Sequence, residues 1–173
     1  VLPEHEQPRP DTSAWAVHAT PETRKNLITS IYLDAPAQEA HNLRLQAKYA
    51  AMKADACHEA YLCDDAEIVL VAYGICSRIA RTAAEALRAS GVKAGVFRPL
   101  TLNPFPAEAL SATLLGRRAM VVELSAGQFY NDVILALATA GGRCQEVGLC
   151  NRMGGMVMTV DDVVEAARAT MRK

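Results

Sequence analysis

The sequence has no excess of charge of either sign and no long hydrophobic run. Eighteen lysines and arginines face nineteen aspartates and glutamates, which leaves a formal net charge of −1 at pH 7. Proteins that bind nucleic acid or anionic membranes electrostatically carry a strong basic patch, and bulk charge gives no such signal here. No apolar run approaches the roughly 20 residues of a membrane span. We therefore expect no nucleic-acid partner and no membrane partner.

The first ten residues, VLPEHEQPRP, lack the basic and apolar regions of a secretory signal peptide. This absence predicts a cytoplasmic protein. The sequence begins without methionine, which leaves open whether the chain is a processed product or a piece of a longer polypeptide.

Cysteine motifs and core histidines are also missing. The five cysteines are an odd number and form no C-x-x-C pair. Cys57, His58 and Cys63 come nearest to a metal-ligand set, but reduced thiols in a cytosolic protein are the favoured interpretation. All four histidines precede the first predicted strand, so no Ser/His/Asp or Cys/His nucleophile is expected within the core.

The sequence contains enough apolar residues to form one sizeable hydrophobic core. About half of the 173 residues are hydrophobic, which favours one domain with an additional arm. Residues 1–37 are rich in proline and polar residues, and we expect an arm or linker there. From Glu39 to Ala54 the apolar residues recur every three or four positions, which predicts a helix leading into the domain at 38–173.

Strands and helices alternate through the rest of the chain. Continuous apolar runs such as IVLVAY are typical of strands covered on both faces. Ser77 is the expected N-cap of the first helix after this strand, Pro106 the expected start of the next, and Thr159 with Asp162 a capping box. The pattern predicts an α/β fold with a mostly parallel sheet and helices on both faces. The predicted strands are 68–73, 93–98, 118–124 and 144–149, and helices are expected at 77–91, 106–116, 127–138 and from 159.

The strand–glycine–helix turn YGICSRI resembles the start of a nucleotide site. A dinucleotide fingerprint needs three glycines, and only Gly74 is present. Arg98, at the end of the second predicted strand, could meet a 2′-phosphate, which keeps an NADP-like site open. The favoured interpretation is that Gly74 only turns the chain and that Arg78 faces solvent or a neighbouring subunit.

Two other stretches follow predicted strands. In VVELSAGQFYNDV the side chains of Glu123, Ser125, Gln128 and Asn131 fall where an open parallel sheet presents a functional surface. The alternative is that Ser125 caps a helix whose outer face is solvated. In NRMGGMVM, the glycines permit positive φ or a close approach by another chain, and the methionines are interpreted as core filler.

The ordered set of motifs resembles one family. The motifs are IVLVAYG, SRIARTAAEALRASGVKAGVFRPLTLNPFP, VVELSAGQFYNDV and RMGGMV, and the segment SIYLDAPAQEAHNLRLQAKY precedes them. In this order they are similar to the C-terminal part of the alpha subunit of 2-oxoacid:ferredoxin oxidoreductases, nearest to the branched-chain (2-oxoisovalerate) type. The resemblance implies a three-layer α/β/α domain like the transketolase C-terminal domain. Ile75, Cys76, Phe129 and Tyr130 depart from the family pattern, which bears on the substrate and not on the fold.

The resemblance also implies the cofactors and partners of the whole enzyme. That enzyme decarboxylates a 2-oxoacid with thiamine diphosphate and Mg²⁺, passes the acyl group to coenzyme A, and reduces ferredoxin through iron–sulfur clusters. The family binds thiamine diphosphate with the N-terminal part of the alpha subunit and with the beta subunit, and gamma/delta subunits complete the complex. We therefore expect this chain to bind no cofactor or metal itself.

The resulting hypothesis is a non-catalytic domain that supplies assembly surface. Arg98, Glu123, Gln128 and Asn131 are expected to line a domain or subunit interface. A freestanding NADP-binding or regulatory Rossmann-like module remains a competing interpretation. A similar domain from another thiamine enzyme, such as a 2-oxoacid dehydrogenase beta chain, is a third.

Overall fold

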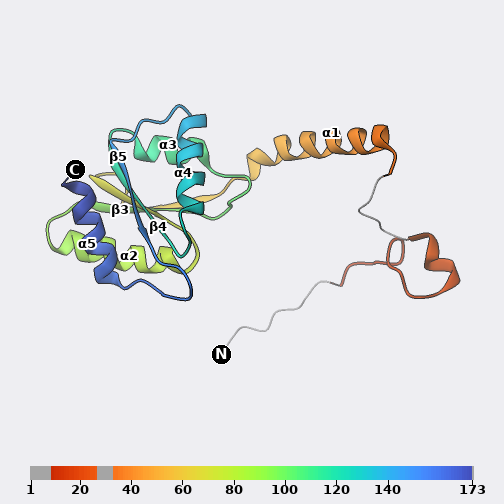
Figure 1. Cartoon of the computed structure of the whole chain (residues 1–173), viewed down its shortest axis with the longest axis horizontal. Coiled ribbons are helices and arrows are strands. Elements are labelled where there is room, and N and C mark those ends of the chain that lie inside the picture. The colour runs from red at the N-terminus through yellow and green to blue at the C-terminus, as the bar shows by residue number, and fades with distance from the viewer. Residues whose placement is uncertain (1–8, 27–32, 173) are drawn as a thin grey trace. The chain divides into compact units, whose positions relative to one another are not determined.

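The computed structural model describes residues 9–26 and 33–172, and the chain divides into two compact units, 1–47 and 48–173 (Figure 1). Residues 1–8 and 27–32 of the expected arm, with His5, lie outside the described residues. In the first unit a 3-10 helix spans Pro21–Asn26. Helix α1 spans Ala35–Met52 and buries none of its side chains.

The start of α1 differs from the expected one at Glu39 for a local reason. Asp34 accepts a hydrogen bond from the backbone N–H of Ala37 at 2.9 Å. A carboxylate in this position satisfies one of the N–H groups that the first helical turn leaves without a partner, so the helix begins at Ala35.

The second unit contains one five-stranded sheet. Its strand order is β1-β3-β2-β4-β5, and every pair is parallel except β1 with β3, which is antiparallel. The mostly parallel sheet predicted from the sequence is confirmed. The strands are β1 (His58–Tyr61), β2 (Ile68–Ala72), β3 (Ala94–Pro99), β4 (Arg118–Glu123) and β5 (Glu146–Asn151).

Strand β1 was not predicted. Its four residues, HEAY, carry no apolar run, and none of them is fully buried. It forms by pairing with β3, where Glu59 lies opposite Arg98 and Tyr61 opposite Val96. The prediction that all four histidines precede the first strand is therefore wrong, because His58 lies in β1 and its ring stacks on that of Phe97 at 5.1 Å.

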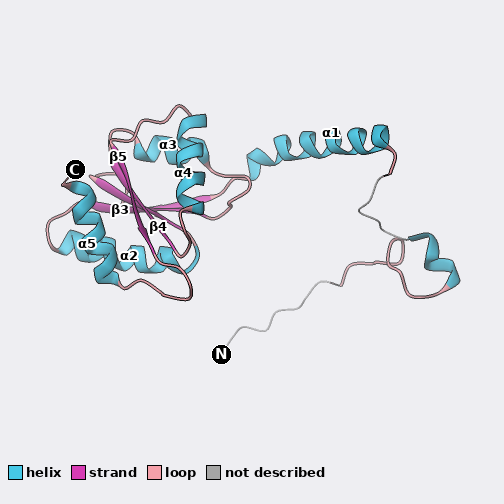
Figure 2. Cartoon of the chain, in the orientation of Figure 1, coloured by secondary structure: helices cyan, strands magenta, loops and turns pink. Residues whose placement is uncertain are grey.

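Helices cover both faces of the sheet, as Figure 2 shows. On one face α2 (Gly74–Ala89) and α5 (Val160–Met171) pack on Ile68, Leu70, Met120 and Val122. On the other face α3 (Ala107–Leu114) and α4 (Gln128–Thr139) pack on the intervening strand residues Val69, Val71, Ala119 and Val121. Because successive strand side chains point to opposite faces, the continuous apolar runs fill two core layers at once.

The helix starts show which capping predictions were right. Thr159 and Asp162 form the expected capping box, with each side chain accepting from the other's backbone N–H. Ser77 is not an N-cap, because α2 begins three residues earlier at Gly74, whose φ of +55° suits glycine. The buried Ser77 hydroxyl instead donates to the Gly74 carbonyl at 2.7 Å. Pro106 was expected to be the first residue of α3, but the helix begins one residue later, at Ala107, and Pro106 is its N-cap.

None of the helices within residues 9–26 and 33–172 is long and apolar enough to cross a membrane.

Candidate functional site

The carboxyl ends of β3, β2, β4 and β5 meet at one edge of the sheet, because these four strands are parallel. We call the segments that follow them, residues 73–75, 100–106, 124–131 and 152–157, the strand-end edge. In open α/β sheets this is the edge where ligands and partners dock.

Glu123 ends β4 and is fully buried. Its carboxyl oxygens accept hydrogen bonds from the backbone N–H groups of Phe129 at 2.9 Å and Tyr130 at 3.4 Å, and from the hydroxyl of Ser125. The N–H groups in the first turn of a helix have no intrahelical acceptor and carry partial positive charge. Glu123 therefore anchors the first turn of α4 through these hydrogen bonds.

This arrangement shows that Ser125 does not cap α4, contrary to what the alternative interpretation expected. The N-cap residue of α4 is Gly127, with φ +98° and no side-chain cap, and Ser125 donates to Glu123 instead of to the helix. The Ser125 carbonyl accepts from the side-chain amide of Asn151 at 2.8 Å, which ties the segment to the end of β5. Glu123, and not Ser125, satisfies the helix terminus.

Gln128 and Asn131 are exposed in the first turn of α4, next to the buried Glu123. The structure thus brings three of the four expected interface residues together, with Gln128 and Asn131 facing outward and Glu123 facing inward. Arg98 lies apart from them, on β3, with β2 between β3 and β4. Its guanidinium pairs with Glu59 at 3.4 Å.

The strand-end edge also exposes large apolar side chains. Met153 and Met156 are 55% and 62% exposed, so the interpretation of these methionines as core filler is wrong. Gly154 and Gly155, with φ of +67° and +87°, turn the chain between them and hold both side chains outward, while Met158 enters the core. Exposed as well along this edge are Tyr73, Ile75, Leu100, Leu102 and Val157.

The cysteines lie in different surroundings. Cys57 is exposed, whereas Cys63 is buried near β3, where its thiol donates to the Val96 carbonyl at 3.3 Å. Burial raises the pKa of the Cys76 thiol, and the nearby charge of Glu123 raises it further. Within the ranges that the structure describes, no group of three or more His, Cys, Asp or Glu side chains is placed to hold a metal ion.

Sequence comparison adds three findings. Residues 66–163 match the model of the family described as pyruvate:ferredoxin oxidoreductase core domain II. The chain is 48% identical over 162 residues to ketoisovalerate oxidoreductase subunit VorB of Methanothermobacter thermautotrophicus, a match that covers 92% of this chain and 44% of that protein. It is 35% identical over 102 residues to 2-oxoglutarate synthase subunit KorA of Methanothermobacter marburgensis, covering 58% of this chain and 26% of that one.

Structural comparison agrees on the fold. A 2-oxoglutarate:ferredoxin oxidoreductase from Magnetococcus marinus superposes with a TM-score of 0.62 at 19% identity, over 82% of this chain and 24% of that chain. A split-gene transketolase gives 0.57 at 21% identity, over 67% and 41%. These confirm the predicted transketolase-like α/β fold.

The chain spans less than half the length of the ketoisovalerate oxidoreductase subunits that it matches. Its family match nevertheless covers more than half of its own residues and lies within the sheet-bearing unit. The chain therefore belongs to the pyruvate:ferredoxin oxidoreductase core domain II family of 2-oxoacid oxidoreductase subunits, and the resemblance to the ketoisovalerate type that its motifs indicated is confirmed.

Proposed function

We propose that this chain is the non-catalytic C-terminal domain of the alpha subunit of a thiamine-diphosphate-dependent 2-oxoacid:ferredoxin oxidoreductase, acting on 2-oxoisovalerate. The observation that carries the proposal is the 48% identity to a ketoisovalerate oxidoreductase subunit over 92% of the chain. The complete enzyme would oxidatively decarboxylate the 2-oxoacid to an acyl-coenzyme A and reduce ferredoxin.

The domain's own role is to supply assembly surface at the strand-end edge. Exposed apolar side chains from three of the four strand ends gather there, and the polar Gln128 and Asn131 project beside them. Apolar patches rimmed by polar residues mark sites of protein association. The partners proposed for this surface are the N-terminal part of the same alpha subunit and the beta and gamma/delta subunits.

We assign the cofactors of the holoenzyme to those partners. Iron–sulfur clusters need four converging cysteine ligands, and the cysteines here are dispersed between surface and core. Mg²⁺ needs gathered oxygen ligands, and the described ranges hold no acidic cluster of three. The residues of this domain therefore do not fit these groups, and no chemical step is placed on them. Ferredoxin and coenzyme A act at the level of the complex.

We propose the cytoplasm as the compartment, because all five cysteines are free thiols and reduced thiols are typical there.

The test uses the chain within its complete oxidoreductase. Ile75→Asp and Met156→Asp place a charge on the strand-end edge, and Leu115→Asp is the matched control, since Leu115 is similarly exposed but precedes the amino end of β4. We expect the first two variants to weaken subunit assembly on size-exclusion chromatography and to lower turnover of 2-oxoisovalerate with coenzyme A and ferredoxin. The control should assemble normally. Unchanged assembly and turnover in both edge variants would contradict the proposal.

The same assay separates the competing interpretations. A 2-oxoacid dehydrogenase component would support reduction of NAD⁺ through a lipoyl partner instead of ferredoxin. A freestanding NADP-binding module would bind NADPH saturably in calorimetry of the chain alone, and its edge variants would leave assembly and turnover of the oxidoreductase unchanged.

A further inference from the structure

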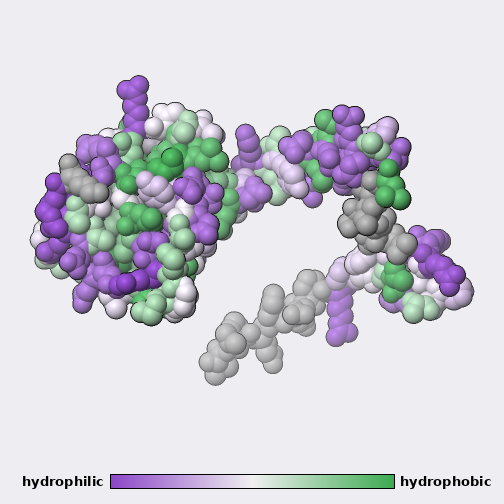
Figure 3. Space-filling view, in the orientation of Figure 1, coloured by the Kyte–Doolittle hydropathy of each residue, from purple (hydrophilic) through white to green (hydrophobic). Residues whose placement is uncertain are grey.

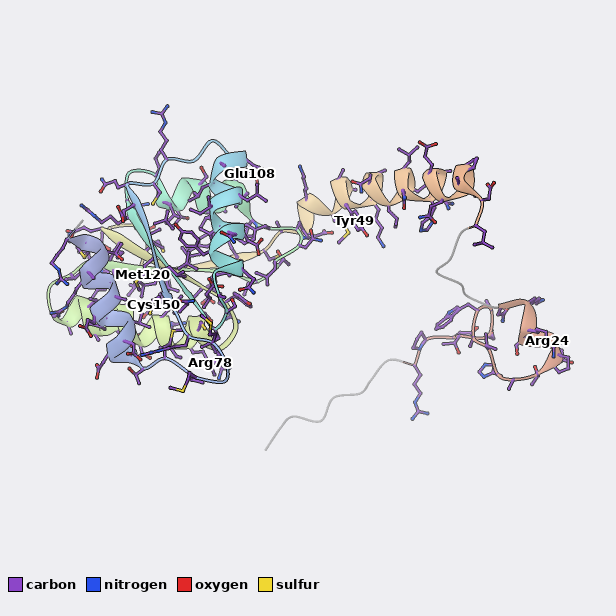
Figure 4. All side chains as sticks on the ribbon, in the orientation of Figure 1. Arg24, Tyr49, Arg78, Glu108, Met120 and Cys150 are labelled. Carbon is purple, nitrogen blue, oxygen red and sulfur yellow. The ribbon has the colours of Figure 1, made fainter. Side chains whose placement is uncertain are left out.

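A pocket of about 180 Å³ lies between α2, the edge strand β1 and its neighbour β3. Three arginines line it, Arg78 and Arg81 from α2 and Arg98 from β3, together with Glu59 and Tyr61 from β1. We call it the arginine pocket. Figure 4 labels Arg78 at the rim of the sheet unit, and Figure 3 shows hydrophilic and hydrophobic residues mixed on the surface of that unit.

The positions of these residues on α2, β1 and β3 bring their side chains into one pocket. Arg78 and Arg81 are three residues apart on α2 and therefore share a helix face. Arg98 lies two residues after Val96, which belongs to the core layer under α2, so Arg98 points to the same side of the sheet. Glu59 lies directly opposite Arg98 in the β1–β3 register.

Arg81 is held in place by an aromatic ring. Its guanidinium carbon lies 3.9 Å from the centroid of the Tyr61 ring, and the Tyr61 hydroxyl donates to Glu85 at 2.9 Å. Cation–π contact of this kind orients a guanidinium without neutralising it. One donor group of the pocket is thus positioned before any ligand arrives.

The charges within the pocket do not balance. Glu85, which is not a lining residue, pairs with Arg81 at 3.9 Å. Glu59 is the single carboxyl group among the described residues that line the pocket, and it pairs with Arg98 at 3.4 Å and with Arg81 at 3.7 Å. Both distances exceed the roughly 2.7–2.9 Å of a strong charge-assisted hydrogen bond. All three side chains are 43–51% exposed, and exposed pairs of this kind contribute little to stability. No carboxyl group in the described part of the chain pairs with Arg78.

We propose that the arginine pocket binds a phosphate group. Guanidinium groups present paired N–H donors that match phosphate oxygens, and a phosphate with up to two negative charges can replace the weak contacts to Glu59. The pocket is smaller than the roughly 300–1,000 Å³ sites that enclose whole drug-sized ligands, so it accommodates the phosphate and not a complete cofactor. The phosphate is either free in solution or the end group of a phosphorylated small molecule. This inference is independent of the oxidoreductase assignment.

Calorimetric titration of the full chain tests the site, with inorganic phosphate, adenosine 3′,5′-bisphosphate and adenosine 2′,5′-bisphosphate as probes at low salt. We expect saturable phosphate binding that weakens by about tenfold or more in Arg78→Gln and in Arg98→Gln, since each removes a charge-assisted hydrogen bond. Arg143→Gln is the matched control, because Arg143 is exposed outside the pocket and should leave binding unchanged. Circular dichroism confirms that each variant is folded, and Arg78→Gln breaks no ion pair within the described residues.

The probes also identify the source of the phosphate. Equal affinity for all three supports recognition of the oxyanion alone, and tighter binding of one bisphosphate supports a nucleotide end group. Absence of saturable binding by any probe, or binding that is unchanged in both pocket variants, overturns the proposal. Capture of a short polyglutamate peptide without phosphate binding also overturns it, since the pocket would then receive an acidic segment of a protein.

Discussion

At the scale of single residues, Glu123 shows how a buried polar side chain is tolerated. It is fully buried, yet its carboxyl group accepts from two backbone N–H groups and a hydroxyl. A buried acceptor with donors on every side avoids the cost of an unsatisfied polar group, and the positive end of the α4 dipole adds to its stabilisation. Glu123, one of the four residues expected to line an interface, thus anchors the first turn of α4, which carries the exposed Gln128 and Asn131.

We predict that Glu123→Gln lowers the free energy of unfolding by about 1–3 kcal/mol, because the amide replaces an acceptor oxygen with a group that cannot accept from Phe129 or Ser125. Urea unfolding measures the change. Glu165→Gln, an exposed carboxyl-to-amide change on α5, should have almost no effect. Equal stabilities of the two variants would show that Glu123 does not anchor α4.

The cysteines provide a second prediction at this scale. Cys57 is exposed, whereas burial raises the pKa of the Cys63 and Cys76 thiols and lowers their thiolate fraction at neutral pH. Iodoacetamide should modify Cys57 first, and mass spectrometry should find Cys63 and Cys76 unmodified until the chain unfolds. A Cys57→Ser chain should lose the fast phase. Fast modification of Cys76 in the native chain would contradict its burial.

At the scale of elements, helices and strands approach closely where side chains are small. A Cβ at Gly148 on β5 would lie 2.3 Å from the Thr170 hydroxyl oxygen on α5. The absence of a side chain at Gly148 therefore sets the distance between β5 and the end of α5.

Gly148→Ala should lower stability by about 1–3 kcal/mol through overpacking. The effect should largely disappear in the Gly148→Ala/Thr170→Ala double variant, because the nearest clashing atoms belong to the Thr170 side chain. Thermal or urea unfolding of the unchanged chain, the two single variants and the double variant completes the double-mutant cycle. Additive effects of the two changes would mean that another contact sets this distance.

Arg88 of α2 joins β3 and the loop between β1 and β2 through hydrogen bonds. Its guanidinium donates to the Ala94 carbonyl at 2.7 Å, to the Leu62 carbonyl at 2.8 Å and to the Asp65 carboxylate at 2.5 Å. The bond from Arg88 holds the pKa of Asp65 below its usual value.

The sign of the resulting pH dependence follows from linkage. A group whose pKa is lowered by folding stabilises the folded chain above its unfolded pKa of about 3.9 and loses that contribution as the pH falls through the folded value. Asp65→Asn should therefore reduce stability at neutral pH, and the difference from the unchanged chain should shrink below about pH 4. Denaturant unfolding at several pH values measures this. Asp64→Asn is the matched control, and a pH-independent difference for Asp65→Asn would contradict the pairing.

At the scale of the whole molecule, the chain consists of two units with very different burial. Every fully buried side chain in the described ranges belongs to residue 63 or a later one, whereas the 3-10 helix and α1 bury none. We propose on this basis that the domain does not depend on the arm at 1–37.

Two truncations test that proposal. Chains of residues 38–173 and 53–173 should unfold cooperatively with midpoints close to that of the full chain, because both keep the two core layers. A loss of 1 kcal/mol would lower the midpoint by roughly 4 °C. Strong destabilisation of the 53–173 chain alone would mean that the domain requires α1. Strong destabilisation of both truncated chains would mean that the domain requires the arm, which would contradict the proposal.

The sequence by itself determined the four parallel strands β2 to β5 and the main helices. The apolar runs in β2 and β4, the capping box at Thr159 and Asp162, and the glycine turns specify local structure through neighbours in the chain. The ordered motifs also indicated the correct family.

Tertiary structure alone decided the rest. β1 exists because β3 pairs with it, and Glu123 turns inward because its carboxyl group accepts from backbone N–H groups at the start of α4. The arginine pocket likewise joins residues from β1, α2 and β3 that lie far apart in the sequence. Local patterns encode periodicity and capping, but which side chains meet depends on how separate elements pack, and no short stretch of sequence carries that information.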